Sequence, residues 1–371
     1  MMLSDYLYKK ASQQKVPLMG TFELSPVCNF SCKMCYVRKT PEQIRKEGKC
    51  LIHWEKWVDL AKQCREAGML YLLLTGGEPF LYPGFRELYT CLHEMGFLIY
   101  INSNGTMIDA DTVRWLKQHA PVRVNITLYG ASRETYQRIC GHADGYDRAT
   151  NAIEMLREAG IPLVINASMI PENADDLEKI ISFGKERNIN TRVATYMFPP
   201  MRRDREAQDS RFTPEESASI YIRKMRCLMP QEAYRDFLST QLSKSSSSDN
   251  IDDTWGANQS EFMRCRAGRS NFWISWEGKM TACGMLDFPV AVNPFDQPFR
   301  DCWQELTDCV RTTPVLSGCA GCDKREVCNP CVATIYGETG TTDQKAPYMC
   351  RLAETILGNM KKELEESSHA K

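Results

Sequence analysis

The sequence lacks any apolar run long enough to cross a membrane and lacks a secretory signal. No stretch approaches the roughly 20 apolar residues that a membrane-spanning helix needs. The first ten residues contain no apolar core and no small-residue cleavage site. The formal net charge of the 371 residues is −1, so no global field attracts nucleic acid. The basic stretch 201–205 is diluted by an acid. We therefore expect a cytoplasmic protein with no membrane and no nucleic-acid partner.

Cysteine, by contrast, is abundant, with seventeen residues in the chain. In a cytoplasmic protein so many thiols indicate metal ligands or redox groups rather than disulfides. Ten of them form two groups, one near residue 30 and one between residues 265 and 350. The other seven lie mostly in helix-like patterns and are interpreted as small core residues: Cys50, Cys64, Cys91, Cys140, Cys227, Cys302 and Cys309.

The first group, Cys28, Cys32 and Cys35, has the spacing CxxxCxxC and follows a strand-like apolar segment at 18–24. Three thiolates this close can share one iron–sulfur cube, which leaves the fourth iron without a protein ligand. An open iron can bind a substrate or cofactor, so the spacing indicates chemistry rather than simple electron carriage. A structural zinc would need a fourth ligand, and residues 36–39 offer none.

The first two thirds of the chain alternates strand-like and helix-like segments. Strands are predicted at 18–24, 70–74, 97–101, 122–128, 163–169 and 191–196. Helices are predicted at 53–67, 85–95, 110–118, 133–139, 146–159 and 174–187. Repeated strand–helix units favour parallel strands with right-handed crossovers. Six such units favour a partial barrel over a closed eightfold one.

The remaining third is organised differently. Helices are predicted at 214–229 and 231–242, a Ser-rich loop at 243–250, a hairpin at 272–276 and 279–283, and a final helix at 352–365. We expect an α/β fold: a partial (β/α)6 TIM-like barrel followed by a small cysteine-rich domain with a β-hairpin. The predicted divisions are an N-terminal segment 1–17, the barrel 18–212, a helical linker 213–260, the cysteine-rich domain 261–352 and a C-terminal helix and tail 353–371.

Polar and glycine-rich motifs follow the predicted strands, where functional groups gather in parallel α/β barrels. Gly76-Gly77-Glu78-Pro79 follows the second strand, Ser103-Asn104-Gly105 the third, and Thr127-Leu128-Tyr129-Gly130 the fourth. A glycine pair lets a ligand approach the backbone, and the glutamate offers a carboxylate to an ammonium group. A tight turn is the alternative interpretation of the glycine pair.

Over residues 18–200 the cysteine run and the Gly-Gly-Glu-Pro motif resemble those of radical S-adenosylmethionine (SAM) enzymes in type, order and spacing. The resemblance implies a 4Fe–4S cluster on Cys28, Cys32 and Cys35 that binds SAM and cleaves it to a 5′-deoxyadenosyl radical, which abstracts hydrogen from a substrate. No catalytic acid or base is identifiable. The implied SAM contacts are Met34, Gly76, Gly77, Glu78, Ser103, Asn104, Thr127, Arg138, Asn166 and Ser168. For Ser103 and Asn104 a strand-end cap is the alternative, and for Arg138 an exposed helix arginine.

The second cysteine group holds Cys265, Cys283, Cys319, Cys322, Cys328, Cys331 and Cys350. Its CxxC pairs alone fit a zinc ribbon, yet seven thiols are one too few for two four-cysteine sites. Beside the first run, the pattern resembles the SPASM extension of radical SAM enzymes, over about 262–352. That resemblance implies two auxiliary 4Fe–4S clusters and hence three clusters in all. The implied outer ligands are Cys319, Cys322, Cys328 and Cys350, and the implied inner ligands are Cys265, Cys283 and Cys331.

The chain departs from the resemblance at the inner cluster. The sulfatase-maturing branch has a further cysteine between the first two SPASM cysteines, and this chain has none. Either Asn271 or a neighbouring residue takes the place of that cysteine, or one iron of the inner cluster stays open. Alternatively, Cys302 or Cys309 reaches back to the inner cluster. The same branch has an aspartate base where this chain has Gly284, which disfavours a sulfatase-maturing enzyme.

We therefore expect a radical SAM oxidoreductase that installs a thioether or similar cross-link in a ribosomally made peptide. The alternatives are a dehydrogenase or epimerase of a small alcohol, sugar or amino acid, and a zinc-stabilised binding module. Expected partners are the peptide and an electron donor such as flavodoxin or ferredoxin. Because only 1–17 precedes the first strand, the barrel, the SPASM face or a separate leader-binding protein is expected to recognise the peptide, unless the substrate is smaller.

Iron content separates the cluster hypothesis from the zinc module. Protein purified without oxygen should be brown, absorb near 400 nm and hold about a dozen irons per chain if three cubes are present. Zinc is d10 and colourless. A colourless protein with stoichiometric zinc and no iron would contradict the cluster hypothesis.

Overall fold

The computed structural model describes residues 3–200, 202, 210–244, 262–263, 265–316, 319, 322–328 and 331–369. Most of the Ser-rich loop predicted at 243–250 lies outside these residues. Within the described ranges, every helix is too short or too polar to span a bilayer.

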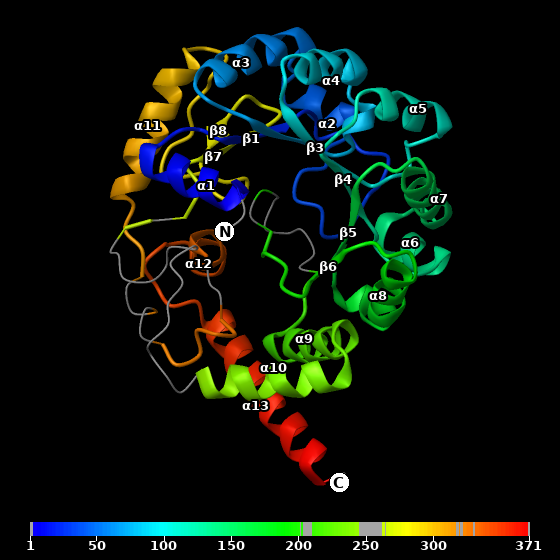
Figure 1. The fold of residues 1–371 in the computed structure, drawn as a ribbon. Helices are drawn as coiled ribbons and strands as arrows, with labels where there is room; N and C mark the ends of the chain where they lie inside the picture. Colours follow the sequence, from blue (N-terminus) through cyan, green and yellow to red (C-terminus); the bar gives the residue numbers. More distant parts are fainter. Residues whose placement is uncertain are drawn as a thin grey trace.

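Six parallel strands, each followed by helix, form the predicted partial barrel (Figure 1). The α/β fold class is thereby confirmed. All six strands fall within a few residues of the predicted ranges: β1 (Met19–Glu23), β2 (Tyr71–Thr75), β3 (Leu98–Ser103), β4 (Arg123–Thr127), β5 (Leu163–Ser168) and β6 (Thr191–Ala194). Each pairs in parallel with the next, so their carboxyl ends lie along one edge.

Helices cover the outside of this sheet. Those near predicted ranges are α3 (Trp54–Glu66), α4 (Phe85–Glu94), α5 (Ala110–Gln118), α6 (Arg133–Cys140), α7 (Gly145–Glu158), α8 (Leu177–Glu186), α9 (Pro214–Leu228), α10 (Gln231–Lys244) and α13 (Pro347–His369). The helix predicted at 174–187 begins later, because a separate 3-10 turn, η2 (Pro171–Asp176), precedes α8. A second 3-10 turn, η1 (Pro79–Leu81), follows β2.

Four helices were not predicted: α1 (Leu3–Gln14), α2 (Pro41–Lys46), α11 (Phe299–Thr312) and α12 (Val332–Thr339). The last two lie in the region expected to be loop-rich. Helix α11 is strongly amphipathic, with Phe299, Trp303 and Leu306 on its buried face. Its apolar face packs on α3, where burial outweighs the surrounding loop signals.

The predicted C-terminal hairpin is present as β7 (Asn271–Ile274) and β8 (Met280–Thr281), paired antiparallel. Strand β7 also pairs in parallel with β1, which gives one sheet in the order β6-β5-β4-β3-β2-β1-β7-β8. The hairpin therefore continues the barrel sheet, and β1 has a parallel neighbour on each side.

The largest apolar core lies between this sheet and its helices. Phe22 of β1 and Trp57 of α3 are both fully buried, with ring centroids 4.8 Å apart. A second core joins α9, α10 and α13 through Ile222, Leu238 and Ile356. These packed faces hold the strand ends rigidly, and the site is built on those ends.

One buried amide ties the loops after β4 and β5 together. Asn173 is 1% exposed. Its Nδ2 donates to the carbonyls of Tyr129 (2.9 Å) and Ser168 (3.1 Å), and its Oδ1 accepts from the Ile170 N–H (2.8 Å). Three backbone groups therefore depend on this single side chain.

We predict that Asn173→Ala lowers the free energy of unfolding by about 1–3 kcal/mol, because it leaves these buried groups unpaired. Urea unfolding measures the change. The matched control is Asn190→Ala, whose side chain is exposed and which should change stability little. Equal stability of the two variants would contradict the role assigned to Asn173.

Candidate active site

A buried carboxylate joins the ends of β2 and β3. Glu78 is fully buried and accepts from the Ser103 hydroxyl (2.9 and 3.1 Å), the Asn104 N–H (2.8 Å) and the Phe80 N–H (3.2 Å). Burial raises the pKa of Glu78 to about 7, although these hydrogen bonds act in the opposite direction. Ser103 thus joins the ends of β2 and β3 through Glu78, and its contact with SAM stays a prediction.

The glycine pair before Glu78 brings the β2 turn against the loop after β1. The Gly77 N–H donates to the Ser25 carbonyl (2.6 Å) and the Glu78 N–H to the Val27 carbonyl (2.9 Å). A Cβ on Gly76 would lie 2.4 Å from the Ser25 oxygen, and one on Gly77 2.3 Å from the Val27 oxygen. Both glycines are therefore required by a close approach of two backbones.

The three thiols of the first group lie in that loop. Burial raises the pKa of Cys28 to about 12, and the neighbouring Cys32 and Cys35 thiols add to the rise. Asn104 Nδ2 lies 3.6 Å from Cys28 Sγ and 2.9 Å from Asn29 Oδ1. The end of β3 therefore contacts the cysteine loop directly, as the sequence predicted for this rim.

Cys140, interpreted from sequence as a core residue, is buried but also contacts this group. A hydrogen bond between the Cys140 and Cys32 thiols lowers the pKa of Cys32 and raises that of Cys140. The Cys140 carbonyl accepts from the Ser31 N–H at 2.9 Å. Nothing in the residue spacing signals this neighbour.

The donor set of the first group fits an iron–sulfur cube. Across the described ranges, no three Cys, His, Asp or Glu side chains converge as ligands of a single ion do. A cube binds each thiolate through a different iron, so its ligands stand further apart than those of one ion. Three thiols in one loop, held by backbone contacts from β2, meet that requirement.

The thiols of the second group form two sets of neighbours, the same two sets that the resemblance to SPASM implies. Burial raises the pKa of Cys265 to about 12, with Cys283 and Cys331 close enough to add to it. Burial likewise raises the pKa of Cys328 to about 12, and its neighbours Cys350, Cys319 and Cys322 add to it. The structure therefore brings three thiols together in one place and four in another. Their roles as ligands stay predictions.

The side chains of Asn271 and Cys302, two residues offered as a fourth inner ligand, have other neighbours in the structure. Asn271 Oδ1 accepts from the Ser270 hydroxyl at 3.3 Å. Cys302 is buried on α11 with Cys64 of α3 as its thiol neighbour. Neither is among the neighbours that influence Cys265 or Cys283.

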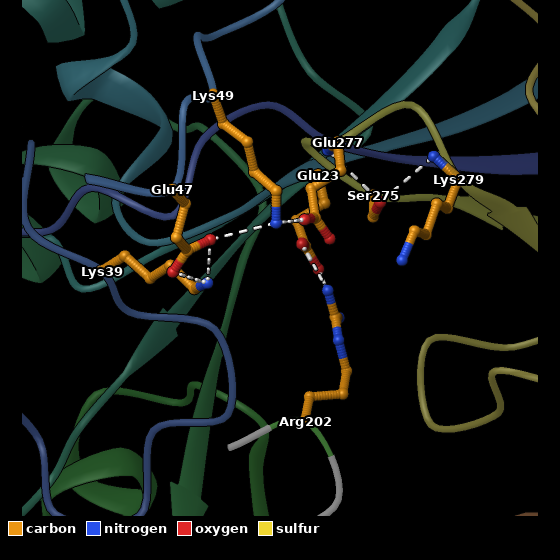
Figure 2. A network of polar contacts seen from close by, with 8 residues as sticks. All are labelled: Glu23, Lys39, Glu47, Lys49, Arg202, Ser275, Glu277 and Lys279. Atoms are coloured by element: carbon orange, nitrogen blue, oxygen red, sulfur yellow. Dashed lines mark hydrogen bonds and ion pairs between the residues drawn. The ribbon is translucent and has the colours of Figure 1, made fainter. Parts of the chain in front are cut away.

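A second buried carboxylate, missed from the sequence, lies at the end of β1. Glu23 is fully buried and forms a two-pronged ion pair with Arg202, in which Nη1 and Nη2 each lie 2.8 Å from a carboxylate oxygen (Figure 2). Trp273 Nε1 of β7 also donates to Glu23, at 3.1 Å. The sequence signal that could have indicated this carboxylate is a glutamate within the strand-like segment 18–24.

Further charges surround this pair in a separate chain of contacts. Lys39 and Lys49 both contact Glu47, at 2.5 and 3.0 Å, and Lys49 also pairs with Glu277. Figure 2 shows this chain beside the Glu23–Arg202 pair. Both lysines lie near the Trp276 ring, at 5.8 and 5.7 Å from its centroid.

Comparison with known proteins identifies a domain. The model of the Radical SAM superfamily matches residues 22–184, which include the three-thiol loop, Glu78 and the ends of β1 to β5. Residues 22–184 form a radical SAM domain. The cofactors that such a domain implies are SAM and a 4Fe–4S cluster, and the C-terminal cysteine-rich region fits SPASM.

Proteins similar to this chain have several names. An AdoMet-dependent heme synthase of Methanosarcina barkeri is 24% identical, over 90% of this chain and 96% of that protein. The sporulation killing factor maturation protein SkfB of Bacillus subtilis is 26% identical over 74% of this chain, which spans 62% of SkfB.

Two solved structures share the fold. Native anSMEcpe with bound AdoMet and a peptide has a TM-score of 0.68 at 13% identity, over 96% of this chain and all of that one. SuiB of Streptococcus suis bound to the precursor peptide SuiA has a TM-score of 0.65 at 16% identity, over 94% and 80%.

The other predicted SAM contacts lie on or beside the same strand ends. Thr127 and Asn166 are register partners on β4 and β5, and both are half-buried, as is Ser168. Arg138 instead donates to the Glu172 carbonyl, at 3.0 and 2.6 Å, and so holds the loop after β5. Met34 packs, partly buried, against the main core.

Glu78 should make the stability of the cofactor-free radical SAM chain depend on pH. Its folded pKa of about 7 exceeds the ordinary 4.5, so the folded state holds this proton more strongly. Stability therefore falls as pH rises from about 4.5 to 7, by about 3 kcal/mol from this group. Urea unfolding from pH 5 to 8 should show this decrease in the wild type relative to Glu78→Gln. Parallel pH profiles would contradict the prediction.

Proposed function

We propose that this chain is a radical SAM oxidoreductase that modifies a peptide, installing a thioether or similar cross-link. The observation that carries the proposal is the inner thiol group, in which Cys265, Cys283 and Cys331 come together. No fourth cysteine joins them among the described residues. A cube on three thiolates leaves one iron that can accept a substrate thiolate.

In this proposal the protein's own groups position the reactants. When bound, the first cluster supplies the electron that cleaves SAM, held by Cys28, Cys32 and Cys35. Glu78 fixes the strand ends, and the half-buried Thr127, Asn166 and Ser168 offer polar groups to the cofactor. The outer group of Cys319, Cys322, Cys328 and Cys350 would hold a further cluster.

Two of the comparisons support a peptide as the substrate. The relative SkfB is a maturation protein, and the solved SuiB complex contains a precursor peptide. An electron donor such as flavodoxin or ferredoxin, and a separate leader-binding protein, belong to the proposal as further partners.

A second candidate is a tetrapyrrole-modifying enzyme. The observation that favours it is the heme synthase relative, which this chain matches over 96% of its length. An Fe-coproporphyrin III synthase of the same organism is 25% identical over 83% of its length.

One anaerobic assay separates the two candidates. Reconstituted protein with SAM and a reductant is incubated with a cysteine-containing candidate precursor peptide, or with Fe-coproporphyrin III. We expect 5′-deoxyadenosine above the substrate-free control, and loss of two mass units from the peptide, because ring closure removes two hydrogens. Cys283→Ser should abolish cross-linking but leave SAM cleavage measurable. A mass change in the tetrapyrrole alone would favour the second candidate and contradict the first.

A further inference from the structure

A continuous series of contacts joins the two predicted metal sites. Tyr36 directly follows Cys35, and its ring centroid lies 5.4 Å from the Arg202 guanidinium carbon. Arg202 pairs with Glu23, and Glu23 accepts from Trp273.

Trp273 in turn packs on the residue that follows Cys283. A Cβ on Gly284 would lie 2.6 Å from the Trp273 ring, so the indole occupies the space a side chain at 284 would need. The side chains of Arg202, Glu23 and Trp273 therefore form a series of contacts that runs from the residue after Cys35 to the residue after Cys283.

Arg202 has hydrogen-bond donors to spare. A guanidinium carries five N–H donors in a fixed fork. Glu23 accepts one hydrogen bond from Nη1 and one from Nη2. The described residues supply no acceptor for the other three N–H groups. The side chain is 23% exposed, whereas its partner Glu23 is 0% exposed. The pair thus holds the guanidinium rigidly while part of it stays accessible.

The charges around Arg202 favour a neutral acceptor over an anion. Its own charge is balanced by Glu23, and Lys39 and Lys49 are balanced by Glu47 and Glu277. Lys279, the other cation in Figure 2, is exposed. A group bearing several carboxylates would need uncompensated cations, whereas a peptide carbonyl needs only oriented N–H donors.

We propose that Arg202, oriented by Glu23 and Trp273, is a specificity-determining residue that donates to a backbone carbonyl of the peptide substrate between the two metal sites. The inference rests on the proposed function and names how that substrate is recognised.

The test begins with the reconstituted wild type. SAM cleavage without peptide examines the proposed radical chemistry separately from peptide recognition. A random library of peptides with blocked termini is then selected on the wild type, and the selected peptides are measured by fluorescence anisotropy. Fe-coproporphyrin III serves as the anionic probe.

Arg202→Lys keeps the positive charge but removes the fixed fork of N–H donors. We expect this change to weaken binding of the selected peptides about tenfold. Trp273→Phe removes the indole donor to Glu23 and part of the packing on Gly284, and should weaken binding by a smaller factor. The matched control is Arg223→Lys, because Arg223 forms a similar two-pronged pair with Glu178 between α9 and α8 (2.9 and 2.7 Å). This control should bind as the wild type does. Circular dichroism and iron content verify that each variant is folded.

An amide-to-ester scan of one selected peptide distinguishes a direct contact from a structural role. An ester carbonyl is a weaker acceptor, so one position should reduce binding to the wild type but not to Arg202→Lys. Unchanged binding by a folded Arg202→Lys, identical ester profiles, or failure of the wild type to select any peptide would overturn the inference. Tight, Arg202-dependent binding of Fe-coproporphyrin III would also overturn it. Absence of SAM cleavage in the wild type would instead contradict the proposed function.

Discussion

The pairing of β1 with a parallel neighbour on each side is the constraint on which the rest of the site depends. Strand β2 on one side carries the glycine pair and Glu78, and β7 on the other carries Trp273. The loop that follows β1 holds the first three thiols. Because parallel strands end at a common edge, Glu23 and Trp273, which are 250 residues apart, reach one place.

Two buried carboxylates at this edge are stabilised in different ways. Glu78 faces neutral donors only, which do not fully replace lost hydration, and its pKa is raised. Glu23 faces a guanidinium in two-pronged geometry as well as an indole N–H. A charge buried with a partner is held at a defined position, whereas removing either partner would leave the other unpaired. Glu78 therefore holds the ends of β2 and β3 together, and Glu23 holds the Arg202 guanidinium in place.

The barrel was predictable from the sequence because its strands are short apolar runs separated by helices that end at glycine, as at Gly68 and Gly96. The division of the later cysteines into sets of three and four was implied by the resemblance to SPASM, because spacing alone also fitted a zinc ribbon. The β1–β7 pairing was not predictable, because two hairpin strands carry no signal for the distant strand that they join. Helix α11 was missed because its pattern lies among loop signals. Arg202 was missed because its partner is 179 residues away and its neighbours in sequence suggested only a solvated loop.

The close approach at Gly76 and Gly77 separates the position of the cysteine loop from the choice of side chains on that loop. The cysteine loop is located by main-chain contacts to β2, with no room for an added carbon atom. Main-chain contacts therefore fix part of its position whichever side chains the loop carries. Under the proposed function, residues that contact the substrate can change while the thiols that would hold the first cluster stay in place. Such a scaffold can acquire new substrates without relocating its most reactive step.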